Sequence, residues 1–326
     1  MSKTQKKTKT QRSRQKKKKQ HTNIFRNAIL AGLFVGALAS FGKAFLFPSL
    51  ASESFSDKPV ITITDYTEVY GNPPAPKPTA QPVNASRPVV IDDLHLLEDE
   101  ETESRLASLA RKDADIAEIY AKRSEYPEEM LMALAFNPEM TEFVKGYLSS
   151  DGSVTGGFTE TEITQNFPLF LQWDTRWGYV PYGGMNIGMS GCGPTCLSMV
   201  IFALTGDPSA TPDALAAYSM KNGYYMKGTG TAWALMTDAP YSYGLRAAEL
   251  GLDEAEMKYC LDRGFPIICS MRPGDFTLTG HFIVIYGYDD TGFFVNDPNS
   301  MERSGRRWDF ETLHGQIKNL WYYSRA

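Results

Sequence analysis

One segment, residues 188–206, limits the possible folds more than any other part of the chain. It begins with the turn GMSGCG, whose glycines let the backbone bend tightly and approach its neighbours closely. The mostly apolar run LSMVIFAL follows Pro194, and Gly206 can end a helix in the left-handed conformation. A helix that is apolar all round is buried. The segment therefore predicts a central buried helix with Cys192 at its N-terminus.

A predicted β-hairpin brings a histidine close to two candidate hydrogen-bond acceptors. The run HFIVIYGY is an apolar strand that begins at His281, and the turn signal DDTG follows it. The next run, FFVND, returns antiparallel and brings Asn296 and Asp297 toward His281. An acceptor in that place can hold the imidazole ring and select its tautomer, as the third member of a catalytic triad does.

Cys192 has the predicted surroundings of a nucleophile. At a helix N-terminus, unpaired N–H groups and the helix dipole favour a thiolate over a thiol. The same N–H groups can face the oxyanion that forms when the thiolate attacks a carbonyl. A further donor lies upstream in the segment QWDTRWG, where the side-chain amide of Gln172 can reach the oxyanion. We expect the rest of that segment to form a packed structural corner.

These patterns predict an α+β domain over residues 160–326, in which the Cys192 helix packs on an antiparallel sheet. The predicted strands are 266–271, 281–288, 292–296 and 320–323, and the other predicted helices lie near 212–222, 231–239 and 253–263.

The N-terminal part of the chain has a different composition. Residues 1–26 hold eight Lys and three Arg and no acidic residue, which leaves a net charge of −16 on the remainder. An acidic body argues against nucleic acid as a partner. The uncharged, mostly apolar run 28–42 follows this basic cytoplasmic tail and predicts a single-pass signal-anchor over 27–50, with the catalytic domain outside the cell membrane. A cleaved signal peptide, and so a secreted protein, stays open as the alternative.

Two further regions precede the catalytic domain. Residues 51–90 include six prolines between positions 71 and 88, a density that disfavours helix and predicts an extended stalk. Residues 91–150 carry apolar residues at helical spacing and predict several short helices. Two roles stay open for these helices: a packing element of the domain, or an inhibitory segment over the active site.

Four motifs in this order, QWDTRWG, GCGPTC, GHFIVIYG and VNDP, resemble the papain-like cysteine peptidases of family thirty-nine. The chain is most similar to exported, stand-alone relatives of the bacteriocin leader peptidases, over about residues 125–326. The resemblance implies a papain-like α+β fold and a peptide or protein substrate. It also implies four roles: Cys192 as nucleophile, His281 as base, Asp297 as orienting acid and Gln172 as oxyanion donor.

Two departures from the leader peptidases limit what the resemblance implies. In those enzymes the glutamine lies only a few residues before the cysteine, whereas Gln172 and Cys192 are 20 residues apart, so a segment such as 178–188 must loop out. The chain also lacks the phosphate-binding pattern GxxxxGK[ST] of an ATP-driven exporter. Two alternatives to a general peptidase follow: a cell-wall amidase or endopeptidase that acts on peptidoglycan peptides, and a catalytically inactive surface binding module.

No cofactor is predicted for this chemistry. A metal site is conceivable by residue type, but the spacing of the candidate ligands is unlike that of a zinc site. Those ligands are Cys192, Cys196, His281 and Asp297. A disulfide between Cys260 and Cys269 is permitted in an exported protein, and the sequence alone leaves it undecided.

Overall fold

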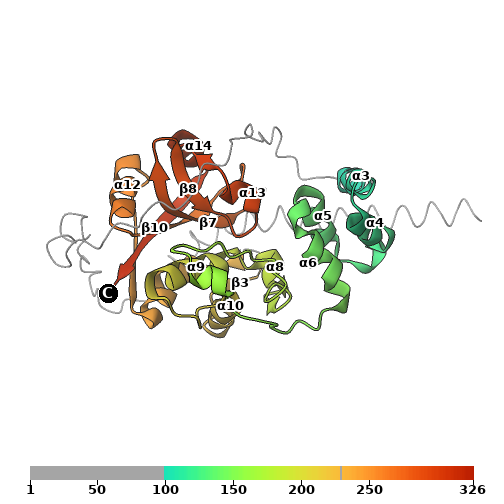
Figure 1. Cartoon of the computed structure of the whole chain (residues 1–326), viewed down its shortest axis with the longest axis horizontal. Helices are drawn as coiled ribbons and strands as arrows, with labels where there is room; N and C mark the ends of the chain where they lie inside the picture. Colours follow the sequence, from blue (N-terminus) through green and yellow to red (C-terminus); the bar gives the residue numbers. More distant parts are fainter. Residues whose placement is uncertain (1–98, 228–229) are drawn as a thin grey trace, which may run out of the picture. The chain divides into compact units, whose positions relative to one another are not determined.

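A six-stranded sheet is the framework of the structure, a computed structural model that describes residues 99–227 and 230–326 (Figure 1). The strand order is β5-β10-β6-β7-β8-β9, and every neighbouring pair is antiparallel. The strands are β5 (Leu245–Glu249), β6 (Ile267–Met271), β7 (His281–Asp289), β8 (Gly292–Asn296), β9 (Arg307–Trp308) and β10 (Ile317–Arg325). The predicted α+β class and its antiparallel sheet are confirmed.

The sequence predicted the four central strands but not the two edge strands. The central strands are rich in buried β-branched and aromatic residues, which fit a pleated surface. The edge strand β5 has the sequence LRAAE, which alternates weakly and is largely unburied. At the other edge, β9 has only two residues. Both edges are fixed by pairing with a distant part of the chain rather than by their own pattern.

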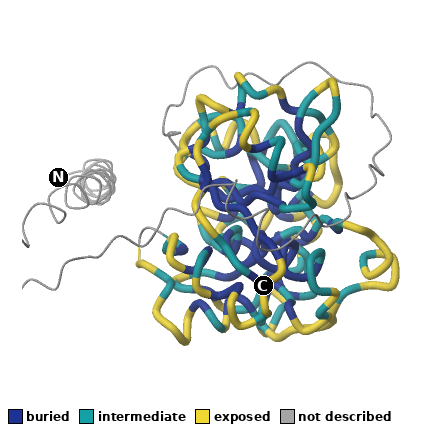
Figure 2. The backbone as a smooth tube through the Cα atoms, turned by 90° about the vertical axis from the view of Figure 1, so that its left-hand side faces the viewer, coloured by how far each residue is buried: buried dark blue, intermediate teal, exposed yellow. Residues whose placement is uncertain are grey.

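The predicted buried helix is α9 (Cys192–Thr205), and it ends at Gly206, whose φ of 73° is left-handed. Residues 193–202 are all buried, and α9 packs against β7, β10 and α10 (Pro212–Lys221). Each fully buried Leu, Ile, Val or Phe stabilises the fold by about 1.5–3 kcal/mol. The buried segments gather in the interior of the domain in Figure 2. The central helix is thus held by apolar contact on every side.

One of the other predicted helices begins three residues later than expected. The helices that complete the domain are α7 (Glu160–Ile163), α8 (Ile187–Ser190), α11 (Ala234–Asp238), α12 (Glu254–Asp262), α13 (Met301–Ser304) and α14 (Phe310–His314), with the 3-10 helix η4 (Ala239–Tyr243). In the segment 231–239 the helix begins only at Ala234. Thr231 instead lies in β4 (Gly230–Thr231), paired with β3 (Tyr225–Met226), because Gly230 adopts a φ of 92° that helices exclude.

A group of short helices, here called the lead-in region (residues 99–149), precedes the domain. It comprises α3 (Asp99–Ala110), α4 (Ala114–Ala121), η1 (Arg123–Glu125), α5 (Glu128–Phe136), η2 (Pro138–Met140), α6 (Thr141–Gly146) and η3 (Tyr147–Ser149). This confirms the short helices predicted for the described part of 91–150. The lead-in region has its own apolar core, and Trp173 of the α+β domain that follows is part of that core.

The predicted basic tail, signal-anchor and stalk over residues 1–90 lie outside the described residues. Within residues 99–227 and 230–326, we find no helix with the length and apolar character needed to span a bilayer.

Candidate active site

Cys192 is the first residue of α9 and follows directly on the short helix α8. The turn between the helices is closed by a 2.7 Å hydrogen bond from the Gly191 N–H to the Ile187 carbonyl. A Cβ at position 191 would meet that carbonyl oxygen at 2.6 Å, and a Cβ at 193 would meet the Thr231 side chain at 2.9 Å. The glycines on both sides of Cys192 are therefore required by close contacts, and they fix the cysteine at the helix N-terminus.

The four cysteines differ in exposure, and none forms a disulfide. Burial raises the pKa of the Cys196 and Cys269 thiols well above the usual value and raises that of Cys260 to about 12. Cys192, in contrast, is half-buried. Because burial disfavours the thiolate at the other three positions, Cys192 is the cysteine suited to nucleophilic attack. The disulfide between Cys260 and Cys269 that the sequence left open is not formed.

His281 opens strand β7 and lies between an acid and the thiol. Its Nε2 is 2.7 Å from Oδ1 of Asp297, and both side chains are buried. Burial by itself lowers the pKa of His281, but Asp297 and the Cys192 side chain outweigh it and raise the pKa to about 9. Since Nε2 is engaged by the acid, Nδ1 is the ring nitrogen left for Cys192. The buried imidazole is therefore held in its charged form by partners on two sides.

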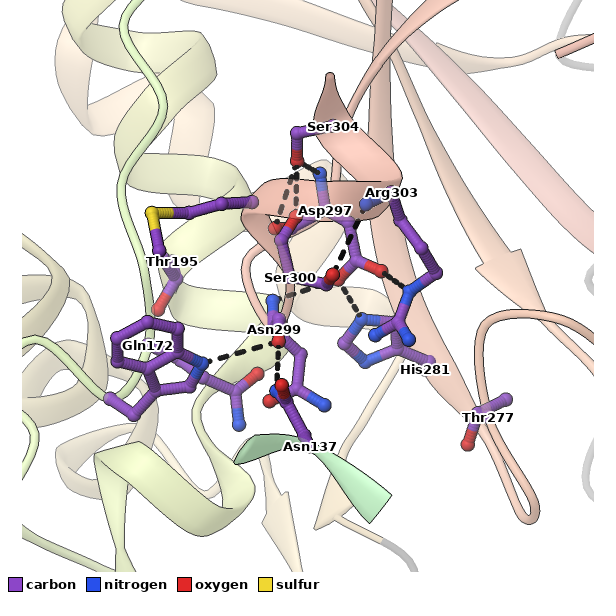
Figure 3. A network of polar contacts seen from close by, with 12 residues as sticks. Asn137, Gln172, Thr195, Thr277, His281, Asp297, Asn299, Ser300, Arg303 and Ser304 are labelled. Atoms are coloured by element: carbon purple, nitrogen blue, oxygen red, sulfur yellow. Dashed lines mark hydrogen bonds and ion pairs between the residues drawn. The ribbon is translucent and has the colours of Figure 1, made fainter. Parts of the chain in front are cut away.

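Asp297, rather than Asn296, is the acceptor that holds the ring. Figure 3 shows the side chains of His281 and Arg303 converging on the Asp297 carboxylate. The Arg303 Nε lies 2.5 Å from Oδ2, and the Asn299 N–H donates to Oδ1 at 2.7 Å. Burial favours the protonated acid, but His281 and Arg303 together lower the pKa of Asp297 below its usual value. The amide of Asn296 instead donates to the Pro168 carbonyl.

Gln172 is buried, and its amide lies against the helix that precedes Cys192. The Gln172 Nε2 donates to the Gly188 carbonyl in α8 at 2.8 Å, and its second amide hydrogen has no partner within residues 99–227 and 230–326. Its Oε1 is also buried and has no hydrogen-bond partner in the described part of the chain. The structure thus places a spare donor on the N-terminal side of α9.

The segment 178–188 loops out between Gln172 and Cys192, as the spacing requires. It forms the hairpin β1 (Pro181–Tyr182) and β2 (Met185–Asn186), and the Gly188 N–H donates to the Gly178 carbonyl at 2.8 Å. The chain therefore returns to its starting point before α9 begins. This closure brings Gln172 beside α8 despite the distance in sequence.

The rest of the QWDTRWG segment is the predicted structural corner. Arg176 pairs with Asp174 at 2.6 Å and with Glu162 at 2.7 Å, while Trp177 is fully buried. Its indole N–H donates to the Leu171 carbonyl. These contacts fix the backbone around Gln172, and their role is structural.

The lead-in region also reaches the site, through residues that the sequence did not single out. The Asn137 amide donates to the Asn299 carbonyl at 2.5 Å. The Glu139 carboxylate accepts hydrogen bonds from the N–H groups of Met301 (2.6 Å) and Glu302 (2.9 Å). No local pattern indicates these contacts, because they join residues about 160 positions apart.

The metal alternative finds no support in the geometry. In the ranges 99–227 and 230–326, no cluster of three or more His, Cys, Asp or Glu side chains is placed to hold a metal ion. The arrangement of Cys192, His281 and Asp297 instead offers a thiol, a base and an acid in series. Such a series can activate a sulfur nucleophile for attack on a carbonyl.

Comparison with known proteins gives the following similarities. The sequence profile of the Peptidase_C39 like family matches residues 164–326. The peptidase domain of Streptococcus ComA, a bi-functional ABC transporter in a quorum sensing pathway, is 18% identical with a TM-score of 0.34, over 44% of this chain and 97% of that domain. A double glycine motif protease from an AMS/PCAT transporter, solved with its leader peptide, is 16% identical with a TM-score of 0.34, over 53% and 97%. A C39-like peptidase from Bacillus anthracis is 15% identical with a TM-score of 0.29, over 49% and 96%. Among curated proteins, no match was found.

Proposed function

This chain belongs to the Peptidase_C39 like family of cysteine peptidases, and we propose that it hydrolyses peptide bonds through a triad of Cys192, His281 and Asp297. We propose Gln172 as the side-chain donor to the oxyanion. One observation carries the proposal: Asp297 binds Nε2 of the buried His281 ring, and the side chain of Cys192 also interacts with that ring and raises its pKa. A histidine that served only the packing of the core would have no need of a thiol at a helix N-terminus beside it.

The first half of the reaction forms an acyl-enzyme. The Cys192 thiolate attacks the carbonyl carbon of the peptide bond, and a C–S bond forms as the carbonyl electrons move to oxygen. The Cys192 backbone N–H and the free amide hydrogen of Gln172 stabilise the oxyanion. The imidazolium of His281 gives its proton to the amine as the C–N bond breaks. Asp297 keeps the ring oriented throughout and is not itself protonated.

The second half releases the product with water as co-substrate. The neutral His281 takes a proton from water, and the resulting hydroxide attacks the thioester carbonyl. The C–S bond then breaks and returns the electron pair to Cys192 as thiolate, next to the re-formed imidazolium. The products are a carboxylic acid and an amine.

The substrate class and the location are further parts of the proposal. We propose a peptide or protein substrate, in keeping with the AMS/PCAT protease that was solved with a leader peptide. The Lys-rich tail before the apolar run 28–42 supports a catalytic domain on the outer side of the cell membrane. Protease added to intact protoplasts is then expected to digest that domain. Protection until lysis would instead favour a cytoplasmic peptidase.

Alkylation of the cysteines tests the triad without a known substrate. Iodoacetamide at pH 6, followed by peptide mass spectrometry, should modify Cys192 before Cys196, Cys260 and Cys269, since burial keeps those three thiols protonated. His281→Ala should slow the labelling of Cys192, because the imidazolium partner is lost. Asn296→Ala is the matched control and should leave the labelling rate unchanged. Labelling of Cys192 that ignores His281 would contradict the triad.

The substrate class needs a separate experiment. The full chain, with Cys192→Ser as its matched control, is incubated with a library of bacterial peptides and with purified cell-wall sacculi. New peptide termini that depend on Cys192 are expected in the library, and the peptide cleaved fastest then serves for kinetics. Soluble fragments from the sacculi alone would identify a cell-wall amidase or endopeptidase instead.

A further inference from the structure

We infer that Glu139 is a positioning residue for Asp297, so that the lead-in region is a fixed part of the catalytic unit rather than an inhibitory segment. The inference deepens the proposed function and rests on it. It decides between the two roles that the sequence left open for the lead-in region. Its argument follows a chain of contacts from Glu139 to the triad.

The first contact joins Glu139 to the start of α13. Its carboxylate accepts the N–H groups of Met301 and Glu302, and it also accepts the Ser300 hydroxyl at 3.2 Å. The first N–H groups of a helix have no partner within the helix, and a carboxylate there completes them with charge-assisted bonds. Glu139 therefore fixes both the position and the direction of this single helical turn.

The second contact joins α13 to the acid of the triad. Arg303 of α13 binds Oδ2 of Asp297 through Nε, and the Asp297 N–H donates to the Ser304 hydroxyl at 2.8 Å. Asp297 in turn binds His281 at 2.7 Å. With four residues, α13 is too short to hold its own orientation, since helices of this length are not stable by themselves. Ser300 caps the helix by accepting the Arg303 N–H, and Glu139 completes the remaining N–H groups of Met301 and Glu302.

A third set of contacts comes from the same region and reinforces the first two. The Asn137 amide and the Trp173 indole N–H both donate to the Asn299 carbonyl, at 2.5 and 3.2 Å. Asn299 in turn donates its own N–H to Asp297. Figure 3 shows Asn137 approaching the loop from below, beside Asn299. Asn137 and Glu139 of the lead-in region thus hold the Asp297 loop at two points, and Trp173 of the following domain adds a contact at the first of them.

The lead-in region also packs against the other half of the site. Phe143 of α6 lies so close to Gly188 that a Cβ there would collide with its ring, and it stacks on Tyr179 with centroids 4.9 Å apart. Gly188 supplies the carbonyl that holds the Gln172 amide. Yet Cys192 stays half-buried with the lead-in region in place. The region therefore contacts the supports of the site and leaves Cys192 partly exposed.

Substitutions of Glu139 in the full chain test the inference. Glu139→Ala should lower kcat by about 10–100-fold with little change in KM, because misplaced catalytic groups lose transition-state stabilisation. Glu139→Gln keeps the shape and one acceptor and should lie between this variant and the wild type. The matched control is Glu129→Gln, the same change on the exposed start of α5, and it should leave kcat unchanged.

Two readouts separate positioning from a loss of folding. Asp297 and Cys192 are the groups that face His281, with Arg303 behind Asp297, so a misplaced Asp297 leaves the imidazole less protonated at neutral pH. Glu139→Ala should then slow iodoacetamide labelling of Cys192 at pH 7 and move the alkaline limb of kcat/KM to lower pH. A variant that is only partly unfolded would have a lower kcat/KM at every pH, and its alkaline limb would stay at the wild-type pH. That result would overturn the inference.

A double-mutant cycle completes the test. If Glu139 acts through Asp297, Glu139→Ala should have less than a twofold effect on labelling in the Asp297→Asn background. An equal effect in both backgrounds would contradict the inference. Because labelling needs no substrate, the two proposals fail differently. Loss of the His281 dependence removes the proposed function, whereas normal labelling in Glu139→Ala removes only the role of Glu139.

Discussion

The two halves of the site are built from different interactions. On the base side, the buried Asp297 carboxylate accepts hydrogen bonds from His281, Arg303 and the Asn299 backbone. On the nucleophile side, Cys192 is placed by the turn before α9 and by the apolar packing of that helix. There the amide of Gln172 has a buried oxygen without a partner in the described residues. One half is held by paired charges and the other by backbone and shape.

The difference between Asp297 and Gln172 follows from when each of them faces a charged partner. Asp297 and His281 are charged in the resting enzyme, and buried charges persist only when they are paired and hydrogen-bonded. The oxyanion exists only during the reaction, so its donors must have capacity to spare before the substrate arrives. Gln172 can meet this requirement only through its second amide hydrogen, which has no partner among the described residues, because its buried Oε1 accepts and cannot donate.

The largest expected effect is a difference in stability between variants of the base side and variants of the nucleophile side. Asp297→Ala should lower kcat by about 10⁴. It should also lower the free energy of unfolding by roughly 3–5 kcal/mol, because it leaves His281 and Arg303 without their buried partner. Cys192→Ser should abolish activity as completely, yet lower the free energy of unfolding by only about 1 kcal/mol, because Asp297 still pairs with His281. Urea denaturation of both variants at pH 7 measures the contrast.

Asn296→Ala is the control for this contrast. It removes one hydrogen bond, to the Pro168 carbonyl, next to the acid. It should cost about 1 kcal/mol of stability and leave kcat within about twofold of the wild type. Equal losses of stability in Cys192→Ser and Asp297→Ala would show that the halves are not built differently.

A smaller effect is expected on the nucleophile side. Gln172→Ala should lower kcat by about 10²–10³, the usual cost of losing an oxyanion donor. Its free energy of unfolding should fall by only about 1–2 kcal/mol, since the side chain makes one hydrogen bond, to Gly188. Cys192 should still react with iodoacetamide at its normal rate. A folded variant with near-normal kcat would move the donor role to another group.

The smallest effect concerns pH and belongs to the base side. The pKa of His281 is raised to about 9, so the imidazolium is present at neutral pH and is lost as pH rises through 9. The rate constant kcat/KM should therefore fall about tenfold for each pH unit above that value. Asp297→Asn should move this limb to lower pH, because the charge that opposes burial is gone. Gln172→Ala should leave the limb in place, and a wild-type limb near 6.5 would contradict the pairing.

Much of the fold and the site follows from local sequence patterns. The glycines around Cys192, the apolar run of α9 and the turn between β7 and β8 each act over fewer than twenty residues. The choice between Asn296 and Asp297 did not follow from the hairpin alone. The bulge between Ile285 and Gly287 changes the register, and the chain turns after β8 so that Asp297 reaches His281.

The residues that the sequence missed act over long distances. Glu139 follows Asn137 and Pro138, an ordinary helix start in which an acid is expected for local reasons. Its contact with α13 depends on how the lead-in region packs, which no periodicity encodes. Arg303 lies on a helix of one turn, which has no apolar face from which the sequence could indicate the helix. Both residues support the site from outside the motifs.

The hairpin of residues 178–188 has a consequence for how such a chain can change. Its two ends meet at the hydrogen bond between Gly188 and Gly178, and its Tyr182 is buried in the domain core, where the hydroxyl bonds Ser219 and Thr231. A segment that closes on itself can lengthen at a cost of about 0.6 kcal/mol per doubling, without moving what it connects. The number of residues between Gln172 and Cys192 can therefore change while their positions in space stay the same. The exposed tip of the hairpin, at Gly184, is therefore the place where residues can be inserted while the buried part of the hairpin and the site beside it keep their positions.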